Sequence, residues 1–200
     1  MIKLVKKQKM SNRKKEMIFL LVVLCLFVVA VAVRMVLVHM RYPQVNTIKV
    51  DMGTAYEIDD GLNMEVIKTK YLDNEDLIAA YGADIIENLD VTKTHDMKVI
   101  ETTVKLTNTS DEEKTLSLTE IRIETDYYQN GLVPELFYAE NEDYVMGVDL
   151  ASGESKETTL CYVMFDFQFT DKLWALLEQA DWYLVREEYP DRIRWAVSET

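Results

Sequence analysis

The sequence predicts a mainly β protein: an antiparallel β-sandwich with two short helices, preceded by one N-terminal transmembrane helix. Three observations lead to this prediction. Residues 17–33 form an unbroken apolar run, residues 48–200 alternate apolar and polar side chains in short segments, and two segments there carry helix-capping signals. Alternation with a period of two is typical of strands with one buried face, and several such strands separated by turns are typical of a sandwich.

Residues 17–33 are long enough to cross most of a bilayer. At about 1.5 Å per residue, a helix over 17–33 spans roughly 25 Å and its extension to residue 38 spans roughly 33 Å, against a hydrocarbon core of about 30 Å. Arg34 is the one charged residue of residues 17–40, and its long side chain can reach the headgroups near the outer end. A transmembrane helix is therefore predicted over residues 17–39.

Charge is distributed unequally on the two sides of this segment. Residues 1–16 hold seven basic residues and one acidic residue, whereas residues 41–200 hold 14 basic and 34 acidic residues, a net charge of −20. The N-terminal cations are Lys3, Lys6, Lys7, Lys9, Arg13, Lys14 and Lys15. Because basic residues flank the cytoplasmic end of a membrane helix, we expect a cytoplasmic N-terminus and an extracellular C-terminal domain at the cell membrane. The overall charge of −13 argues against nucleic acid as a partner.

The apolar segment has two interpretations. Ala30-Val31-Ala32 resembles the exit of a cleaved signal peptide, but the apolar run continues past it. An uncleaved signal anchor is favoured, and a cleaved, secreted protein is the alternative. The expected organisation is a basic cytoplasmic tail (1–16), a transmembrane helix (17–39), a stalk (40–47) and an extracytoplasmic β-sandwich domain (48–200).

Strands are predicted from the alternation of side chains along the domain. Residues 62–67 and 100–106 alternate, and the second segment ends in turn-forming residues at 108–111. The parity of residues 116–123 changes at Thr119-Glu120, which predicts a bulge or a bend between sheets. Residues 158–165 are nearly all apolar and predict a central strand covered on both faces. Residues 182–187 and 192–197 predict a hairpin that turns at Pro190-Asp191.

Two helices are predicted from their capping residues. Asp73 can cap a helix that runs through Tyr81, with Asp76 at its third position and Gly82 after its end. Thr170 or Asp171 can cap a second helix. The residues expected on the inner face of this second helix are Phe169, Leu173, Leu176 and Leu177.

The stretch from Val99 to Phe165 resembles a known family. Two segments carry the resemblance: VKLTNTSDEE at residues 104–113 and GESKETTL at residues 153–160. They are similar to the immunoglobulin-like (telokin-like) extracellular domains of unknown function found in membrane-anchored proteins of Gram-positive bacteria. The resemblance implies an immunoglobulin-like sandwich and a surface location, and it implies no known activity.

Few residues could carry catalysis or hold a metal. His39 and His95 are the two histidines, and Cys161 lies in an apolar strand, where a thiol is typically inert packing. A cysteine–histidine nucleophile and a zinc site are therefore not predicted. Three oxygen-rich stretches, at residues 57–61, 73–76 and 140–143, lack the spacing of a calcium-binding EF-hand. We predict no catalytic residue, no cofactor and no metal ligand.

Residues 126–146 form the candidate binding segment. This connection is long and non-periodic, and it holds several aromatic residues among acidic ones: Tyr127, Tyr128, Phe137, Tyr138 and Tyr144. Aromatic side chains in an irregular connection often mark an interaction surface. The alternative is that they fold back and cover the edge of the sandwich.

These observations predict a non-catalytic binding or accessory protein of the bacterial cell envelope. One helix would integrate it into the membrane, and its partner would be a protein or an envelope component, with the ligand unknown. A membrane-tethered hydrolase that uses carboxylates or calcium is an alternative interpretation.

Overall fold

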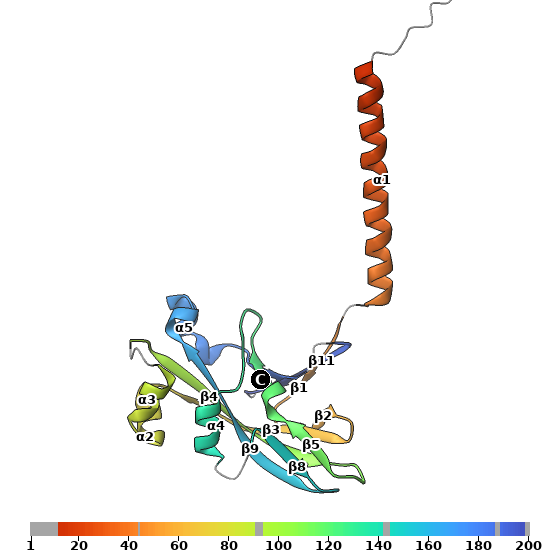
Figure 1. The fold of residues 1–200 in the computed structure, drawn as a ribbon. Helices are drawn as coiled ribbons and strands as arrows, with labels where there is room; N and C mark the ends of the chain where they lie inside the picture. The colour runs from red at the N-terminus through yellow and green to blue at the C-terminus, as the bar shows by residue number, and fades with distance from the viewer. Residues whose placement is uncertain (1–11, 44, 91–93, 142–144, 187–188, 199–200) are drawn as a thin grey trace, which may run out of the picture. The chain divides into compact units, whose positions relative to one another are not determined.

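The computed structural model describes residues 12–43, 45–90, 94–141, 145–186 and 189–198. The chain divides into two compact units, residues 1–44 and residues 45–200 (Figure 1). The first unit contains helix α1 (Asn12–Arg41). In the described part of the chain, this is the one helix long and apolar enough to cross a membrane.

Three of the cations predicted to set the topology have described side chains on this helix. The side chains of Lys14 and Lys15 are exposed in its first turns, and Arg34 is exposed near its C-terminal end. Lys6, Lys7 and Lys9 lie outside the described residues, as does the side chain of Arg13.

The second unit contains a five-stranded sheet with the order β1-β11-β10-β6-β7. Its strands are β1 (Asn46–Val50), β11 (Asp191–Ala196), β10 (Tyr183–Val185), β6 (Arg122–Glu124) and β7 (Gln129–Asn130). The hairpin expected from residues 182–197 is confirmed as the antiparallel pair of β10 and β11. The prediction of a wholly antiparallel sandwich is wrong at β1, which runs parallel to β11.

A four-stranded sheet with the order β2-β3-β4-β9 covers the first, and β5 pairs with β8. These strands are β2 (Tyr56–Asp59), β3 (Leu62–Leu72), β4 (Met97–Asn108), β9 (Ser155–Phe165), β5 (Lys114–Ser117) and β8 (Gly147–Leu150). The strands expected at residues 62–67 and 100–106 are confirmed within β3 and β4. The expected change of sheet at Thr119-Glu120 is also confirmed, because a single 3-10 turn (Leu118–Glu120) separates β5 from β6.

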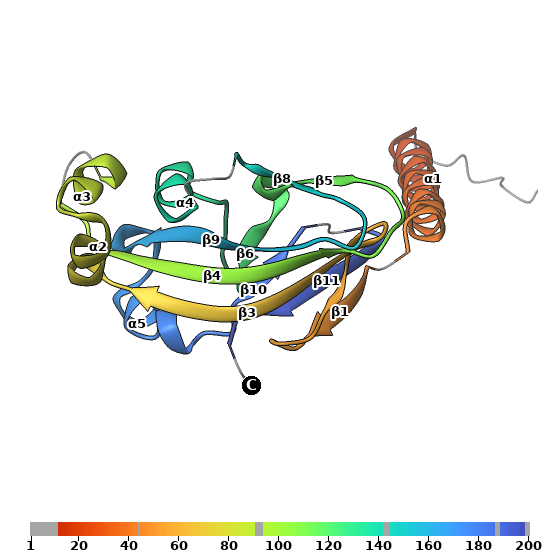
Figure 2. The same ribbon diagram turned by 90° about the horizontal axis from the view of Figure 1, so that it is seen from below.

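Strand β9 is an edge strand, so its predicted central position is wrong. It is apolar on both faces because one face points into the main core and the other is covered by helices. Figure 2 shows α4 beside β9 and helices α2 and α3 at the end of β3 and β4. An apolar run indicates that both faces of a strand are buried, but it does not indicate how many other strands pair with it.

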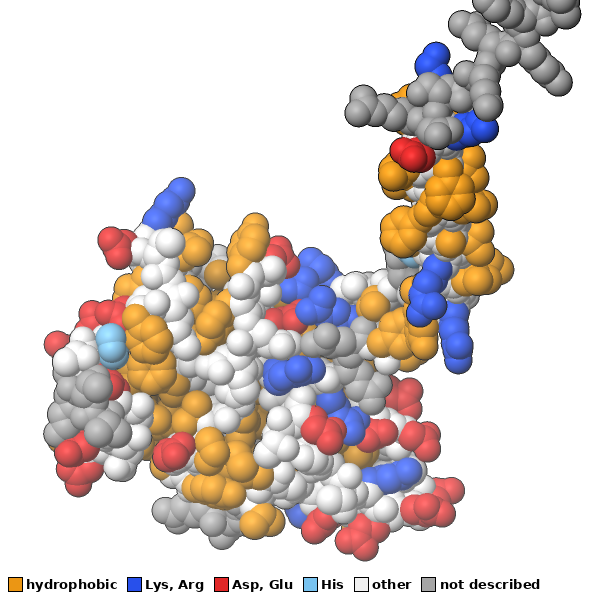
Figure 3. Space-filling view, turned by 45° about the horizontal axis from the view of Figure 1, so that its top comes forward, with side chains coloured by type: hydrophobic (Ala, Val, Ile, Leu, Met, Phe, Trp, Pro, Cys, Tyr) orange, Lys and Arg blue, Asp and Glu red, His pale blue; other side chains and the backbone are white. Residues whose placement is uncertain are grey.

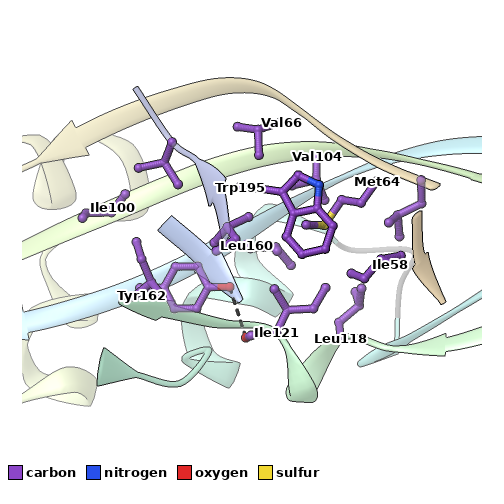
Figure 4. Packing of buried hydrophobic residues seen from close by; sticks show 14 of the residues in the cluster. Ile58, Met64, Val66, Ile100, Val104, Leu118, Ile121, Leu160, Tyr162 and Trp195 are labelled. Atoms are coloured by element: carbon purple, nitrogen blue, oxygen red, sulfur yellow. Dashed lines mark hydrogen bonds between the residues drawn. The ribbon is translucent and has the colours of Figure 1, made fainter. Parts of the chain in front are cut away.

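The main core joins side chains from all three sheets (Figure 4). Its fully buried residues include Met64, Val104, Leu160, Tyr162 and Trp195. The Tyr162 hydroxyl donates a hydrogen bond of 3.2 Å to the carbonyl of Ile121, which satisfies the polar end of a buried ring. A smaller core lies on the opposite face of β4 and β9, where Leu77, Ile85 and Leu136 pack against Val99 and Cys161.

The described residues of the domain include four α-helices: α2 (Asn74–Tyr81), α3 (Asp84–Leu89), α4 (Pro134–Glu140) and α5 (Asp171–Ala175). The predicted cap of α2 is confirmed, since the Asp73 carboxylate accepts bonds from the backbone of Glu75 and Asp76. Thr170 caps α5, as expected. Helices α3 and α4 were not predicted. The expected inner face of α5 is wrong at Leu173 and Leu176, which are 48 % and 41 % exposed.

Candidate functional site

The candidate binding segment, residues 126–146, divides into two parts with different surroundings. Tyr127 is 88 % exposed, and Tyr128 is half-buried. Further along, Phe137 is fully buried in the core and Tyr138, on α4, is 46 % exposed. Tyr144 lies outside the described residues. Of the four predicted binding residues that the structure describes, Tyr127 and Tyr128 line the same pocket, and Phe137 and Tyr138 do not line it.

The second part of the segment covers the open edge of β9. The backbone N–H of Val133 donates to the carbonyl of Cys161 (2.9 Å), and the Asn130 amide donates to the carbonyl of Val163 (2.6 Å). The Asn141 side chain bonds both backbone groups of Thr159. An unpaired strand edge invites pairing with other chains, so this part of the segment closes the sandwich.

The first part of the segment lines a pocket of about 380 Å³. One wall is the turn between β6 and β7, and the other is residues 168–182, which include α5. The Tyr128 ring lies 4.7 Å from Phe169 and 6.1 Å from Trp182, measured between ring centroids. The described residues that line the pocket also include Leu173, Leu177, Gln168 and Asp181.

Local hydrogen bonds hold the pocket walls in place. The Thr125 N–H donates to the carbonyl of Tyr128 (2.8 Å), which closes the turn that presents Tyr127 to solvent. The Tyr128 hydroxyl donates to Gln168 (2.9 Å), and the Trp182 indole donates to the carbonyl of Leu177 (2.8 Å). Because these polar groups are satisfied by the protein, the rings are fixed before any ligand arrives.

The pocket carries a negative bias. Asp126 and Asp181 line it, and none of its described lining residues is basic. The Asp126 carboxylate forms an ion pair with the Arg194 guanidinium (3.3 Å), whereas the Asp181 side chain is exposed. Burial raises the pKa of Tyr128 more than its bond to Gln168 lowers it, so this phenol is neutral at physiological pH.

Exposed apolar side chains also lie within or next to residues 168–182, which form one wall of the pocket. Leu173, which lines the pocket, and its neighbour Leu176 are both exposed, and Phe167 is 63 % exposed just before Gln168. Figure 3 shows hydrophobic side chains gathered on the face of the domain that carries α5. An exposed apolar patch of this kind is typical of an interaction site.

The Cys161 thiol and the His95 imidazole, considered above as a nucleophile and its base, lie in different environments. Cys161 is fully buried, and burial together with the nearby Glu101 carboxylate raises its pKa, so it is held as a neutral thiol. His95 instead lies 3.1 Å from Asp166. No group of three or more metal-binding side chains occurs among the residues described in the structure.

The fold and the pocket define a β-sandwich domain with an aromatic pocket between the β6–β7 turn and residues 168–182. The chain belongs to the family described as Domain of unknown function (DUF5028), which matches residues 40–193. None of the curated proteins matches the sequence.

Several solved structures are similar to this chain. The yjhA protein of Bacillus subtilis is 16 % identical, with a TM-score of 0.42, over 70 % of this chain and 81 % of that one. An uncharacterized β-sandwich protein of Clostridium difficile is 13 % identical, with a TM-score of 0.42, over 78 % and 97 %. A conserved hypothetical protein of Bacillus anthracis is 12 % identical, with a TM-score of 0.45, over 74 % and 95 %. At these identities and TM-scores, none of them assigns a function.

Proposed function

We propose that the protein is a non-catalytic binding or accessory protein of the cell envelope, anchored by α1, with its N-terminus in the cytoplasm and its sandwich domain outside. The exposed apolar surface of α1 and the basic residues before it support the anchor and its orientation. The similarity of residues 99–165 to telokin-like domains supports an immunoglobulin-like sandwich.

The aromatic pocket is the observation that carries the binding role. Ligand sites are typically concave, about 300–1,000 Å³ in volume, and lined by apolar and aromatic side chains with a few polar groups. The pocket formed around Tyr128, Phe169 and Trp182 has these properties. We infer that it holds part of a partner protein or envelope component near the membrane.

Binding is tested with full-length protein in detergent, using quantitative recovery of a cross-linked partner. We expect Tyr127→Ser and Tyr128→Ser to reduce recovery. Tyr138→Ser is the matched control, because Tyr138 is a partly exposed tyrosine of the same segment outside the pocket. Equal recovery with all three variants would show that the pocket does not bind the partner.

Topology is tested by labelling single introduced cysteines with a membrane-impermeant maleimide. Asp111→Cys lies in an exposed turn of the domain, and Gln8→Cys lies in the basic tail. We expect Asp111→Cys to react in intact cells and Gln8→Cys to react only after permeabilisation. The native background is low, because Cys161 is buried and Cys25 lies within the apolar run. The opposite pattern of labelling would contradict the proposed orientation.

A further inference from the structure

We propose that the aromatic pocket takes an organic cation, namely the ammonium or guanidinium group of a lysine or arginine side chain on a partner polypeptide. This inference rests on the proposed binding function and names the chemistry of its ligand.

The aromatic rings of the pocket favour a cationic ligand. A cation over the face of an aromatic ring is stabilised by the negative charge density of that face. Elsewhere in the domain the protein supplies such cations itself: Lys49 and Arg194 lie 5.2 Å and 4.0 Å from the centroid of the Tyr183 ring. In the described part of the chain, no such contact is made to Tyr127, Tyr128 or Phe169. These rings are therefore available to a cation from outside.

The charge of the pocket lining also favours a cation. Asp126 and Asp181 are the charged groups among the described residues that line the pocket. Asp181 supplies the stronger attraction, since Asp126 is already paired with Arg194. The domain around the pocket is strongly acidic, and an acidic field attracts cationic partners over about one Debye length, roughly 10 Å at 0.1 M salt. An anionic ligand would be repelled by Asp181 within the pocket and by the net negative charge of the domain at longer distance.

The exposed apolar residues near the pocket favour a polypeptide as the source of the cation. A free small molecule would need only the pocket, but apolar exposure extends past its lining residues: Leu176, next in sequence to the lining residue Leu177, is 41 % exposed. Tyr127 also extends into solvent, and it would lose most of its exposure under a larger partner. A polypeptide can place a basic side chain in the pocket and apolar neighbours on this surface, so a polypeptide is the better fit.

The test uses full-length protein in detergent and two capped pentapeptides, one with a central arginine between leucines and one with citrulline, its neutral isostere. We expect the arginine peptide to bind roughly tenfold more tightly, as one cation–π contact and one partly exposed ion pair would give. The difference should shrink at high salt. Asp181→Asn and Tyr127→Leu should each reduce this preference and together should abolish it, whereas the controls Glu113→Gln and Tyr138→Leu should preserve it.

Three outcomes would overturn the inference. Equal affinity for the two peptides, including binding of neither, would show that the pocket does not distinguish a positively charged side chain from a neutral one. Unchanged preference in Asp181→Asn would place the cation elsewhere. Binding of free choline as tightly as the arginine peptide would show that the ligand is a small molecule. If Tyr127→Ser and Tyr128→Ser still reduce recovery of the partner, the proposed function stands without this ligand class, and if they do not, both proposals fail.

Discussion

Replacing Asn141 by alanine tests how the open edge of β9 is closed. The Asn141 side chain is almost fully buried and makes four hydrogen bonds. Its amide donates to the carbonyls of Phe137 (2.9 Å) and Thr159 (2.8 Å). Its carbonyl accepts from the Thr158 hydroxyl (3.1 Å) and the Thr159 N–H (2.9 Å). One side chain therefore connects the end of α4 to the edge of the sheet.

The expected loss follows from these bonds. A net hydrogen bond contributes about 1 kcal/mol, and leaving a buried partner unpaired costs about 1–3 kcal/mol. Thr159 is half-buried, so water can replace part of what Asn141→Ala removes. We expect the free energy of unfolding to fall by about 2–3 kcal/mol. For a domain of this size that corresponds to a fall in Tm of roughly 5–10 °C.

The assay is thermal unfolding of the full-length protein in detergent, followed by tryptophan fluorescence. All three tryptophans, Trp174, Trp182 and Trp195, lie in the sandwich unit, so the signal reports on that unit. The matched control is Asn88→Ala on the exposed side of α3, which should change stability by less than about 0.5 kcal/mol. If Asn141→Ala is no more destabilising than Asn88→Ala, the edge is held by other contacts.

Three further predictions concern buried, capping and titratable groups. The neutral, buried Cys161 thiol should not react with maleimide in the folded protein and should react fully in guanidinium chloride; reaction under native conditions would contradict its burial. Asp73→Ala should lower the free energy of unfolding by about 1 kcal/mol in denaturant titrations, and Asp73→Asn should cost less; equal losses would mean that the cap is not the cause. Burial raises the pKa of Asp59, but the bonds from the Asp60 N–H and the Arg186 guanidinium outweigh burial and leave it below the ordinary 3.8. The folded carboxylate thus binds protons more weakly than the unfolded one, so its stabilisation is present above about pH 4 and is lost as the pH falls through the folded pKa. Asp59→Asn should flatten the acid limb of a plot of Tm against pH, and an unchanged limb would contradict this assignment.

The parts of the fold that could be predicted from the sequence depend on local patterns. Alternation over residues 62–67 and 100–106 is set by which face of a strand is buried, and the cap at Asp73 is set within three residues. The parallel pairing of β1 with β11 joins Asn46 to Asp191. No local pattern contains the information that brings these two segments together.

Helices α3 and α4 were not predicted because they too depend on contacts with distant parts of the chain. Helix α4 had one local signal, Pro134 at its first turn, which is a common helix start. Its seven residues are too few to form a stable helix alone, and burial of Leu136 and Phe137 stabilises it. Helix α3 is equally short and depends on burial of Ile85. Such helices are determined by the surface they cover, which the sequence does not display.

Only one of the two walls of the pocket was predicted from the sequence. Tyr127 and Tyr128 were identified because they are adjacent aromatic residues in an irregular segment. Phe169 was expected on the inner face of a helix and Trp182 at the start of a strand, so neither was predicted as a binding residue, and Asp181 was not singled out. Leu173 and Leu176 were expected on the inner face of a helix, but both are exposed, so this region presents apolar side chains to solvent. The pocket exists because a β-turn and a helix that are far apart in sequence close around it.

The two interpretations of residues 126–146 apply to different parts of the segment, and this division makes them separable. Tyr127 contributes little to packing because it is almost fully exposed, so its substitution should change binding and leave Tm unchanged. Asn141 lies outside the pocket, so its substitution should lower Tm and leave ligand affinity unchanged below the melting range. If instead Asn141→Ala weakened binding in the folded protein, the edge of β9 and the pocket would be coupled through the segment that joins them.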